Sequence, residues 1–263
     1  MSLILLDIGG SYIKCADLRK IPIPSQGSRE EICTALREAV GLQGQARVEG
    51  IGVAIPGPFD FGQGIFLMKH KYAAVYGERF SSLADIPDGI PVRYMHDVNA
   101  PLAGAIRMMG LKDAALVTLG TGLGFSYALD GKVQENEAGS PALSLWKEPW
   151  NGGILEEWVS ARAISGTYTR LSGLPCKSAR DVSLKAEAGD PPALEAYARV
   201  GETLGQALSP ILRHLGIRTL LMGGQISRSL SLMEGPIRRS LPDVAVIPLP
   251  GRAVFEGLSS LFT

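Results

Sequence analysis

A strand, a glycine-containing turn and a second strand occur twice in this chain. The first copy runs from Leu3 to Leu18 around the turn Asp7-Ile8-Gly9-Gly10-Ser11, and the second runs from Ala115 to Lys132 around Gly120-Thr121-Gly122. Short apolar runs that are interrupted by glycines predict buried strands joined by tight turns. The repetition predicts two similar lobes, each of which offers one such turn to a shared cleft.

The two glycine turns are suited to binding phosphate. Adjacent glycines lack a Cβ, so their amides can approach an anion closely and form a concave nest. Asp7, at the end of the first strand, can hold a hydrated Mg²⁺, an ion that takes only one or two protein carboxylates. A plain β-hairpin also explains either copy when it is taken alone, and the repetition favours the phosphate-binding interpretation.

The residues around both turns resemble the phosphate motifs of a known family. Asp7-x-Gly9-Gly10-Ser11-x-x-Lys14 and Leu119-Gly120-Thr121-Gly122-Leu123-Gly124 are similar to the two motifs of the ROK (repressor, open reading frame, kinase) sugar kinases of the actin, hexokinase and heat-shock ATPase superfamily. The resemblance implies an α/β protein with the two-lobed actin-like ATPase (ribonuclease H-like) fold and a central cleft. The expected small N-terminal lobe comprises residues 1–112 and 251–263, and the larger C-terminal lobe comprises residues 113–250. The implied cofactors are ATP and Mg²⁺, which Asp7 would hold through water.

Composition limits the class of partner. The 263 residues, 46% of them hydrophobic, are enough for two lobes with real cores. Twenty-six basic and twenty-six acidic residues cancel, so charge gives no reason to expect nucleic acid or a membrane as partner. No uncharged run approaches the length of a membrane span. We therefore expect a cytoplasmic protein that binds a small-molecule sugar and ATP, and a possible homodimer, which is common among the proteins it resembles.

A strand at Pro91–Met95 leads into His96-Asp97-Val98-Asn99. Ligands bind at the carboxyl ends of strands in open α/β sheets. The family counterpart is an Asn-Asp-Ala-Asn signature whose Asp is the catalytic base, so the resemblance assigns that role to Asp97, while His96 replaces the first Asn. Asp97 alternatively acts only as the N-cap of the following helix, a frequent role for Asp at a strand-to-helix turn.

The resemblance also implies sugar-binding residues. Gly57 lies in a segment that runs along the sugar in the family, His96 and Asp97 adjoin it, and Glu137 and Glu156 are carboxylates able to accept bonds from sugar hydroxyls. A Pro/Gly turn after a core strand is sufficient to explain Gly57. Glu156 is explained equally well as a first-turn glutamate favoured by the helix dipole.

A third glycine turn, Gly223-Gly224, follows an apolar strand that begins at Leu220. In the superfamily such a turn lets the adenine and ribose of ATP lie against the backbone. Strand-Gly-Gly turns are frequent by chance. This one indicates an adenosine site only because it follows the two phosphate motifs in the order found in the superfamily.

One family feature is absent from the sequence. ROK kinases commonly carry a zinc-binding His and a cluster of cysteines after the second phosphate motif, and Ser140 and Ile154 stand where the His and a Cys would be. The sequence therefore predicts a variant without a zinc site. Its cysteines, Cys15, Cys33 and Cys176, are far apart and are typical of reduced structural thiols.

One basic segment and one single lysine each allow two interpretations. The segment Lys69–Tyr76 mixes basic and aromatic residues, and is either a solvated surface or a specificity loop in which His70 or Lys71 reaches an anionic group. Lys14 is interpreted as a surface lysine on its strand in preference to a phosphate contact.

Apolar spacing predicts further helices. They are expected at 29–40, after Ala100 through Met109, and at 155–164, 178–188, 191–215 and 251–262. The apolar stripe of the helix at 191–215 includes Leu194. The last helix is expected to return to the first lobe.

The resemblance implies an ATP-dependent kinase that phosphorylates a hexose or N-acetylhexosamine, glucokinase-like, with Asp97 accepting the hydroxyl proton. A non-catalytic sugar or nucleotide sensor is an alternative, because His96 and Ser140 depart from residues that touch sugar in the family. A kinase that uses polyphosphate or acts on another polyol is another. A repressor of this family would need a DNA-binding helix-turn-helix before the first motif, and the motif begins near the first residue.

Overall fold

The structure is a computed structural model that describes residues 2–42 and 48–263. The chain divides into two compact units, which we call the first and the second unit. The first unit comprises Met1–Leu111, Gly131–Ala142 and Pro250–Thr263, and the second comprises Lys112–Asp130 and Leu143–Leu249. The segment Gly131–Ala142, expected to belong with residues 113–250, packs instead with the first unit. It carries Glu137 and Ser140 to that unit.

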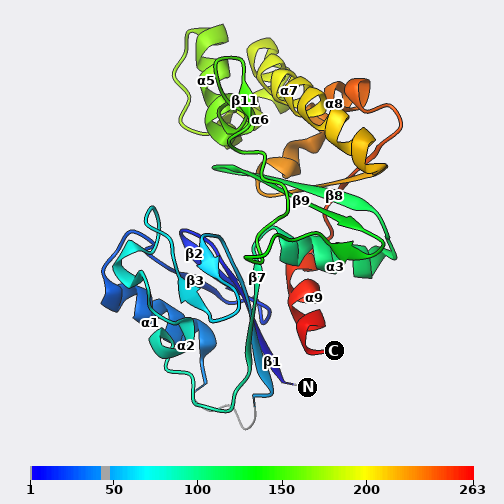
Figure 1. Ribbon diagram of the computed structural model, residues 1–263. Helices are drawn as coiled ribbons and strands as arrows, with labels where there is room; N and C mark the ends of the chain where they lie inside the picture. The colour runs from blue at the N-terminus through cyan, green and yellow to red at the C-terminus, as the bar shows by residue number, and fades with distance from the viewer. Residues whose placement is uncertain (1, 43–47) are drawn as a thin grey trace. The chain divides into compact units, whose positions relative to one another are not determined.

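The strands and helices follow one another in mixed α/β order (Figure 1). The strands are β1 (Leu3–Ile8), β2 (Tyr12–Cys15), β3 (Lys20–Pro22), β4 (Gly50–Ile55), β5 (Phe59–Asp60), β6 (Ile65–Phe66), β7 (Val92–His96), β8 (Ala114–Leu119), β9 (Leu123–Leu129), β10 (Lys132–Val133), β11 (Pro149–Trp150), β12 (Gly153–Ile154), β13 (Thr219–Gly223) and β14 (Ala245–Pro248). The α-helices are α1 (Arg29–Val40), α2 (Phe80–Leu83), α3 (Asn99–Met109), α4 (Glu156–Val159), α5 (Ala161–Ser172), α6 (Ala179–Glu187), α7 (Pro191–Leu215), α8 (Glu234–Ser240) and α9 (Ala253–Ser259). Short 3₁₀ helices are η1 (Ala73–Val75), η2 (Ile226–Leu232) and η3 (Ser260–Phe262).

The sheet of the first unit has the order β3-β2-β1-β4-β7. β1 pairs antiparallel with β2, as the first hairpin pattern predicted, and parallel with β4, which in turn pairs parallel with β7. The carboxyl ends of β1, β4 and β7 therefore meet at one edge. Asp7 lies opposite Ala54, and Ile55 lies opposite His96. This edge is where the sequence placed Asp7 and Asp97.

Helices cover both faces of this sheet, with α1 and α2 on one side and α3 and α9 on the other (Figure 1). β4 is buried at every position, as a central parallel strand covered on both faces should be. The α1 helix begins at a capping box between Ser28 and Glu31 and ends at Gly41 in the left-handed conformation. Its limits are those predicted from the apolar spacing.

The C-terminal helix α9 packs against α3, so the tail returns to the first unit as predicted. The two helices cross at glycines. A Cβ built on Gly104 would overlap the carbonyl oxygen of Ala253, and one on Gly257 would overlap the carbonyl oxygen of Ala100. The absence of side chains at these two positions permits the close approach.

In the second unit, β9, β8, β13 and β14 lie side by side in that order. β8 is antiparallel to β9 and parallel to β13, which repeats the arrangement of β1 with β2 and β4. The hairpin closes at Asp130-Gly131, where both residues have positive φ. Helices α5 to α8 gather on one face of this sheet (Figure 1). The predicted duplication of the strand-turn-strand unit is confirmed.

Two helix predictions for the second unit need correction. The helix expected over 155–164 is interrupted at Ser160, whose extended φ/ψ of −88° and 175° separates α4 from α5. In α7, Leu194 was expected in the buried stripe but its side chain is 40% exposed, while Ala193 and Tyr197 are buried. None of the helices in residues 2–42 and 48–263 has the length and apolar character that crossing a bilayer requires.

Candidate functional site

The carboxylate of Asp7 lies at the end of β1, where Lys14 Nζ approaches its Oδ2 atom to 2.7 Å. Burial raises the pKa of Asp7 above its usual value, and the negative charge of Asp97 adds to this rise, while the ammonium of Lys14 opposes it. The two carboxylates are therefore near enough to interact electrostatically. Lys14 is a surface lysine as predicted, with 62% of its side chain exposed, and it is also the counter-ion of Asp7.

This pair of carboxylates fits a hydrated Mg²⁺, which needs one or two protein carboxylates and keeps several waters. Across residues 2–42 and 48–263, no group of three or more His, Cys, Asp or Glu has an arrangement able to hold a metal. Cys15 and Cys33 are buried free thiols, and Cys176 is partly buried.

The turn after β1 is closed by a bond from Gly9 N–H to Tyr12 O of 3.0 Å. The hydroxyl of Tyr72 donates to Gly9 O, and Ser11 is exposed. A Cβ built on Gly10 would lie 3.5 Å from Lys71 Cε and 3.6 Å from Ser25 Oγ, which are ordinary contact distances. Packing therefore leaves room for a side chain at Gly10, and its glycine is consistent with close approach of a ligand.

Asp97 follows β7 directly, and its side chain is 33% exposed. His96 Nδ1 lies 2.9 Å from Asp97 Oδ1 and 3.3 Å from the backbone nitrogen of Val98. When Nδ1 carries a proton it donates to the carboxylate, and when it does not it accepts from Val98 N–H. The N-cap position of α3 is Val98, with no side-chain capping bond. The helix-capping interpretation of Asp97 is therefore wrong.

Three residues singled out in the sequence come together beside Asp97. A Cβ built on Gly57 would lie 3.5 Å from His96 Nε2 and 3.7 Å from Ser140 Oγ. The ring of Phe61 lies 5.8 Å from that of His96, between ring centroids, and a Cβ built on Gly139 would lie 3.2 Å from Phe61 Cβ. Gly57, His96 and Ser140 therefore lie close together in the first unit.

Glu137 is exposed in the turn that precedes Ser140. Its neighbour Glu135, which the sequence did not single out, accepts a hydrogen bond of 2.9 Å from Asn99 Nδ2. Partial desolvation raises the pKa of Glu135, while the bond from Asn99 and the proximity of His96 oppose the rise. Glu135 thus connects the segment 131–142 to the residues after β7. No motif in the sequence marked Glu135.

In the second unit, the side chain of Glu156 contacts the backbone of the second glycine turn. Its Oε2 accepts from Leu123 N–H at 3.0 Å, and a Cβ on Gly122 would lie 2.6 Å from that oxygen. Ala161 N–H donates to Gly120 O at 2.9 Å, which ties the start of α5 to the same turn. Glu156 stands in the first turn of α4, as the helix-dipole interpretation predicted, and it also holds the phosphate-motif backbone. Thr121 is exposed.

The glycines of the second unit differ in what requires them. Gly224 has φ of +82°, and a Cβ there would overlap the carbonyl oxygen of Leu119; one on Gly223 would lie 3.0 Å from Leu249 Cδ2. Packing alone explains this pair. A Cβ on Gly120, in contrast, would meet no other atom within 4 Å. Packing therefore does not require glycine at Gly120, whereas it does at Gly224.

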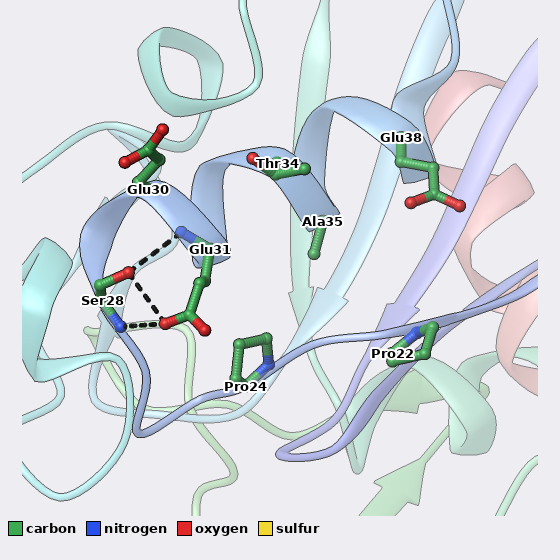
Figure 2. Close-up of a pocket in the computed structure, with 8 residues that line it drawn as sticks. All are labelled: Pro22, Pro24, Ser28, Glu30, Glu31, Thr34, Ala35 and Glu38. Carbon is green, nitrogen blue, oxygen red and sulfur yellow. Dashed lines mark hydrogen bonds between the residues drawn. The ribbon is translucent and has the colours of Figure 1, made fainter.

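A cavity of about 430 Å³ lies elsewhere on the first unit (Figure 2). It is acidic, and Glu31 is turned back onto Ser28 in the capping box of α1 (Figure 2). Its lining residues are Pro22, Pro24, Ser28, Glu30, Glu31, Thr34, Ala35 and Glu38. None of them is a predicted site residue, and the cavity is not the candidate active site.

Comparison with known proteins was made by family model, sequence and structure. The model of the ROK family matches residues 3–142. A glucokinase from Halalkalibacterium halodurans is 26% identical over 289 residues, which cover 91% of this chain and 86% of that protein.

Two solved structures extend over nearly the whole chain. A putative sugar kinase from Cytophaga hutchinsonii has a TM-score of 0.82 at 17% identity and covers 100% of this chain and 99% of that one. A ROK family glucokinase from Streptomyces griseus in complex with glucose and AMPPNP has a TM-score of 0.75 at 21% identity, with 98% of each chain covered. These likenesses show the mixed α/β fold of the actin-like ATPases.

Proposed function

Because this chain belongs to the ROK family, we propose that it is an ATP-dependent kinase that phosphorylates a hydroxyl of a hexose or N-acetylhexosamine. The observation that carries the proposal is the placement of Asp97. Its carboxylate is partly exposed, does not cap α3, and lies at the strand edge that also holds Asp7. A general base needs such an accessible carboxylate beside the phosphate-binding turn.

In the proposed reaction the sugar hydroxyl gives its proton to an oxygen of Asp97 as its own oxygen attacks the γ-phosphorus of ATP. The new O–P bond forms while the bond to the bridging oxygen of ADP breaks. With a proton on Nδ1, His96 would hold the Asp97 carboxylate in place. When bound, Mg²⁺ would neutralise phosphate charge, and Asp7 would hold it through water.

We assign the phosphate chain to backbone amides of both glycine turns, and the adenosine to the turn after β13. The assigned residues are Gly9, Gly10 and Ser11 in the first unit, and Gly120, Thr121, Gly122, Gly223 and Gly224 in the second.

For the sugar we propose Gly57, His96, Asp97 and Glu137. The first three cluster in the first unit, and the exposed carboxylate of Glu137 belongs to the same unit. For Glu156 we prefer a positioning role, because one of its oxygens is already bonded to Leu123 N–H. Its sugar contact, implied by resemblance, is the alternative.

The decisive experiment is a coupled ADP-release assay over a panel of hexoses and amino sugars. Turnover with at least one sugar, absent in Asp97→Asn, would support the kinase. A non-catalytic sensor is the second candidate, because His96 and Ser140 replace family residues that touch sugar; it predicts sugar binding without ADP release. Replacing ATP by inorganic polyphosphate in the same assay, and adding other polyols to the panel, tests the remaining alternatives. We further propose a cytoplasmic protein. A homodimer is one candidate assembly, and size-exclusion chromatography with light scattering would test it.

A further inference from the structure

We propose that Lys71 is a phosphate-binding residue that brings a positive charge to the first glycine turn and contacts the triphosphate chain of the donor. The ligand class is a linear triphosphate, whether it belongs to a nucleotide or to inorganic polyphosphate. The inference deepens the proposed kinase function and rests on it. It also gives a role to the segment Lys69–Tyr76.

The first argument is the position of the ammonium group. A Cβ built on Gly10 would lie 3.7 Å from Lys71 Nζ and 3.5 Å from its Cε. Lys71 is separated from Gly10 by sixty residues of sequence, and tertiary structure alone brings the charge to the turn. An anion bound by the amides of this turn would therefore meet the ammonium at close range.

The second argument is that the loop is fixed on both sides of Lys71. The buried ring of Tyr72 reaches Gly9, where its hydroxyl donates to the carbonyl oxygen, and its own N–H donates to Ser25 O at 2.6 Å. On the other side, the side-chain amide of Gln26 donates to the carbonyl of His70. The backbone of Lys71 is held between these anchors. Less ordering is then needed when a ligand binds.

The third argument is electrostatic. Lys14, the other lysine at this strand edge, has its charge compensated by Asp7. Lys71 has no carboxylate within 4.0 Å in the described part of the chain, and its neighbours are the amides of a glycine turn, which are themselves electropositive. Placing the Lys71 ammonium beside these amides without an anion is electrostatically unfavourable. A phosphate oxygen would accept hydrogen bonds from both groups.

The alternative is that Lys71 is an ordinary surface lysine. Lys69, two residues earlier, is such a lysine: its ammonium lies over the ring of Tyr76, 5.4 Å from the centroid. It has the same charge and belongs to the same loop, but it is directed to a surface ring. Lys69→Met is therefore the matched control for Lys71→Met.

The test is calorimetric titration of the full chain with AMPPNP, inorganic tripolyphosphate and AMP, without sugar. We expect Lys71→Met to weaken binding of AMPPNP and tripolyphosphate by about ten- to a hundredfold, the range for one charge-assisted hydrogen bond. AMP binding should stay unchanged, and Lys69→Met should behave as the wild type. Lys71→Arg should recover part of the loss, and thermal melts should confirm that each variant is folded.

Equal tripolyphosphate and AMPPNP affinities for Lys71→Met and the wild type would overturn the inference, as would an equal loss in Lys69→Met. So would a wild type that binds neither triphosphate. The proposed kinase function fails separately, in the ADP-release assay. If triphosphate binding depends on Lys71 but no phosphoryl transfer is detected, the inference about Lys71 stands and the kinase function is rejected. If the protein is an active kinase and Lys71→Met binds triphosphate like the wild type, the kinase function stands and the inference about Lys71 is rejected.

Discussion

His96 Nδ1 lies 2.9 Å from Asp97 Oδ1, so the residue that departs from the family signature contacts the proposed base directly. The same histidine presents Nε2 to Gly57, on the candidate sugar side. His96 therefore connects the sugar site with the carboxylate that would accept the proton. Substitutions of Asp97 and of His96 can therefore test the proposed base and its positioning residue separately.

Asp97→Asn should lower kcat by about a hundredfold to ten-thousandfold, because the amide cannot accept the hydroxyl proton. AMPPNP affinity should remain within a factor of two or so of the wild type, since the phosphate-binding turns are untouched. Steady-state kinetics and calorimetry measure the two effects. Asp88→Asn, which changes an exposed aspartate of the same unit, is the control. Near wild-type turnover in Asp97→Asn would reject the assignment of the base.

His96→Ala should lower kcat by about ten- to a hundredfold, as expected for losing one hydrogen bond to a charged group. His96→Asn, which restores the family residue, should recover much of that loss because it again offers a donor to Asp97. The KM for ATP should change little in both variants. If the alanine and asparagine variants are equally impaired, His96 does not position Asp97 through a hydrogen bond.

Glu137→Gln and Glu156→Gln should affect different substrates. The first should raise the KM for sugar by about tenfold to a hundredfold, through loss of a charge-assisted bond to a hydroxyl. The second should mainly raise the KM for ATP, because Glu156 Oε2 holds Leu123 N–H in the second glycine turn. Kinetics with both substrates varied separate the two. A pure sugar effect in Glu156→Gln would restore the role implied by family resemblance.

The local features of the fold could be predicted from sequence. Both hairpins follow from apolar runs that end at glycines, and α1 follows from its periodicity, with limits that its capping box explains. The break at Ser160 could not be predicted, because it depends on the bond from Ala161 N–H to Gly120 O, between segments far apart in sequence. Periodicity describes one helix at a time and contains no such information.

The candidate site could likewise be predicted only in part from the sequence. Asp7 and Asp97 each follow an apolar strand, and parallel strands bring their ends to one edge, so their proximity was foreseeable. Lys71 and Glu135 were not assigned, because tertiary contacts alone bring Lys71 to Gly10 and Glu135 to Asn99. A lysine in a mixed basic and aromatic segment looks the same in sequence whether it faces solvent or a phosphate turn.

Asp7→Asn should stabilise the protein at neutral pH while it impairs activity. Burial raises the pKa of Asp7 above 3.8, so between that pH and the raised pKa the folded state binds more protons than the unfolded state. The free energy of unfolding therefore falls as pH rises through this window. The uncharged amide of Asp7→Asn removes the free-energy cost of burying the Asp7 carboxylate. A gain of about 1 kcal/mol would raise Tm by roughly 2–4 °C in a protein of this size.

Melting curves from pH 3.5 to 7 check this expectation. The Tm difference between Asp7→Asn and the wild type should be largest at pH 7 and should shrink toward pH 3.5, where the wild-type carboxyl is protonated. Asp17→Asn is a control of opposite sign, because although partial desolvation raises the pKa of Asp17, hydrogen bonds from Arg19 lower it overall. A pH-independent difference for Asp7→Asn would show that burial does not perturb this carboxylate.

Gly104→Ala should destabilise the protein by about 2 to 3 kcal/mol or more, because the added methyl would overlap backbone of α9 that cannot move as a side chain can. Gly166→Ala in α5 is the matched control: its Cβ would meet only Arg170 Nη1, at 3.8 Å, and helix propensity predicts a gain of about 0.5–1 kcal/mol. Urea unfolding measures both. Limited proteolysis of Gly104→Ala should also release residues after Pro250 sooner than in the wild type, since α9 would be displaced from α3. An unchanged unfolding midpoint and cleavage rate would contradict the packing of the C-terminal helix on the first unit.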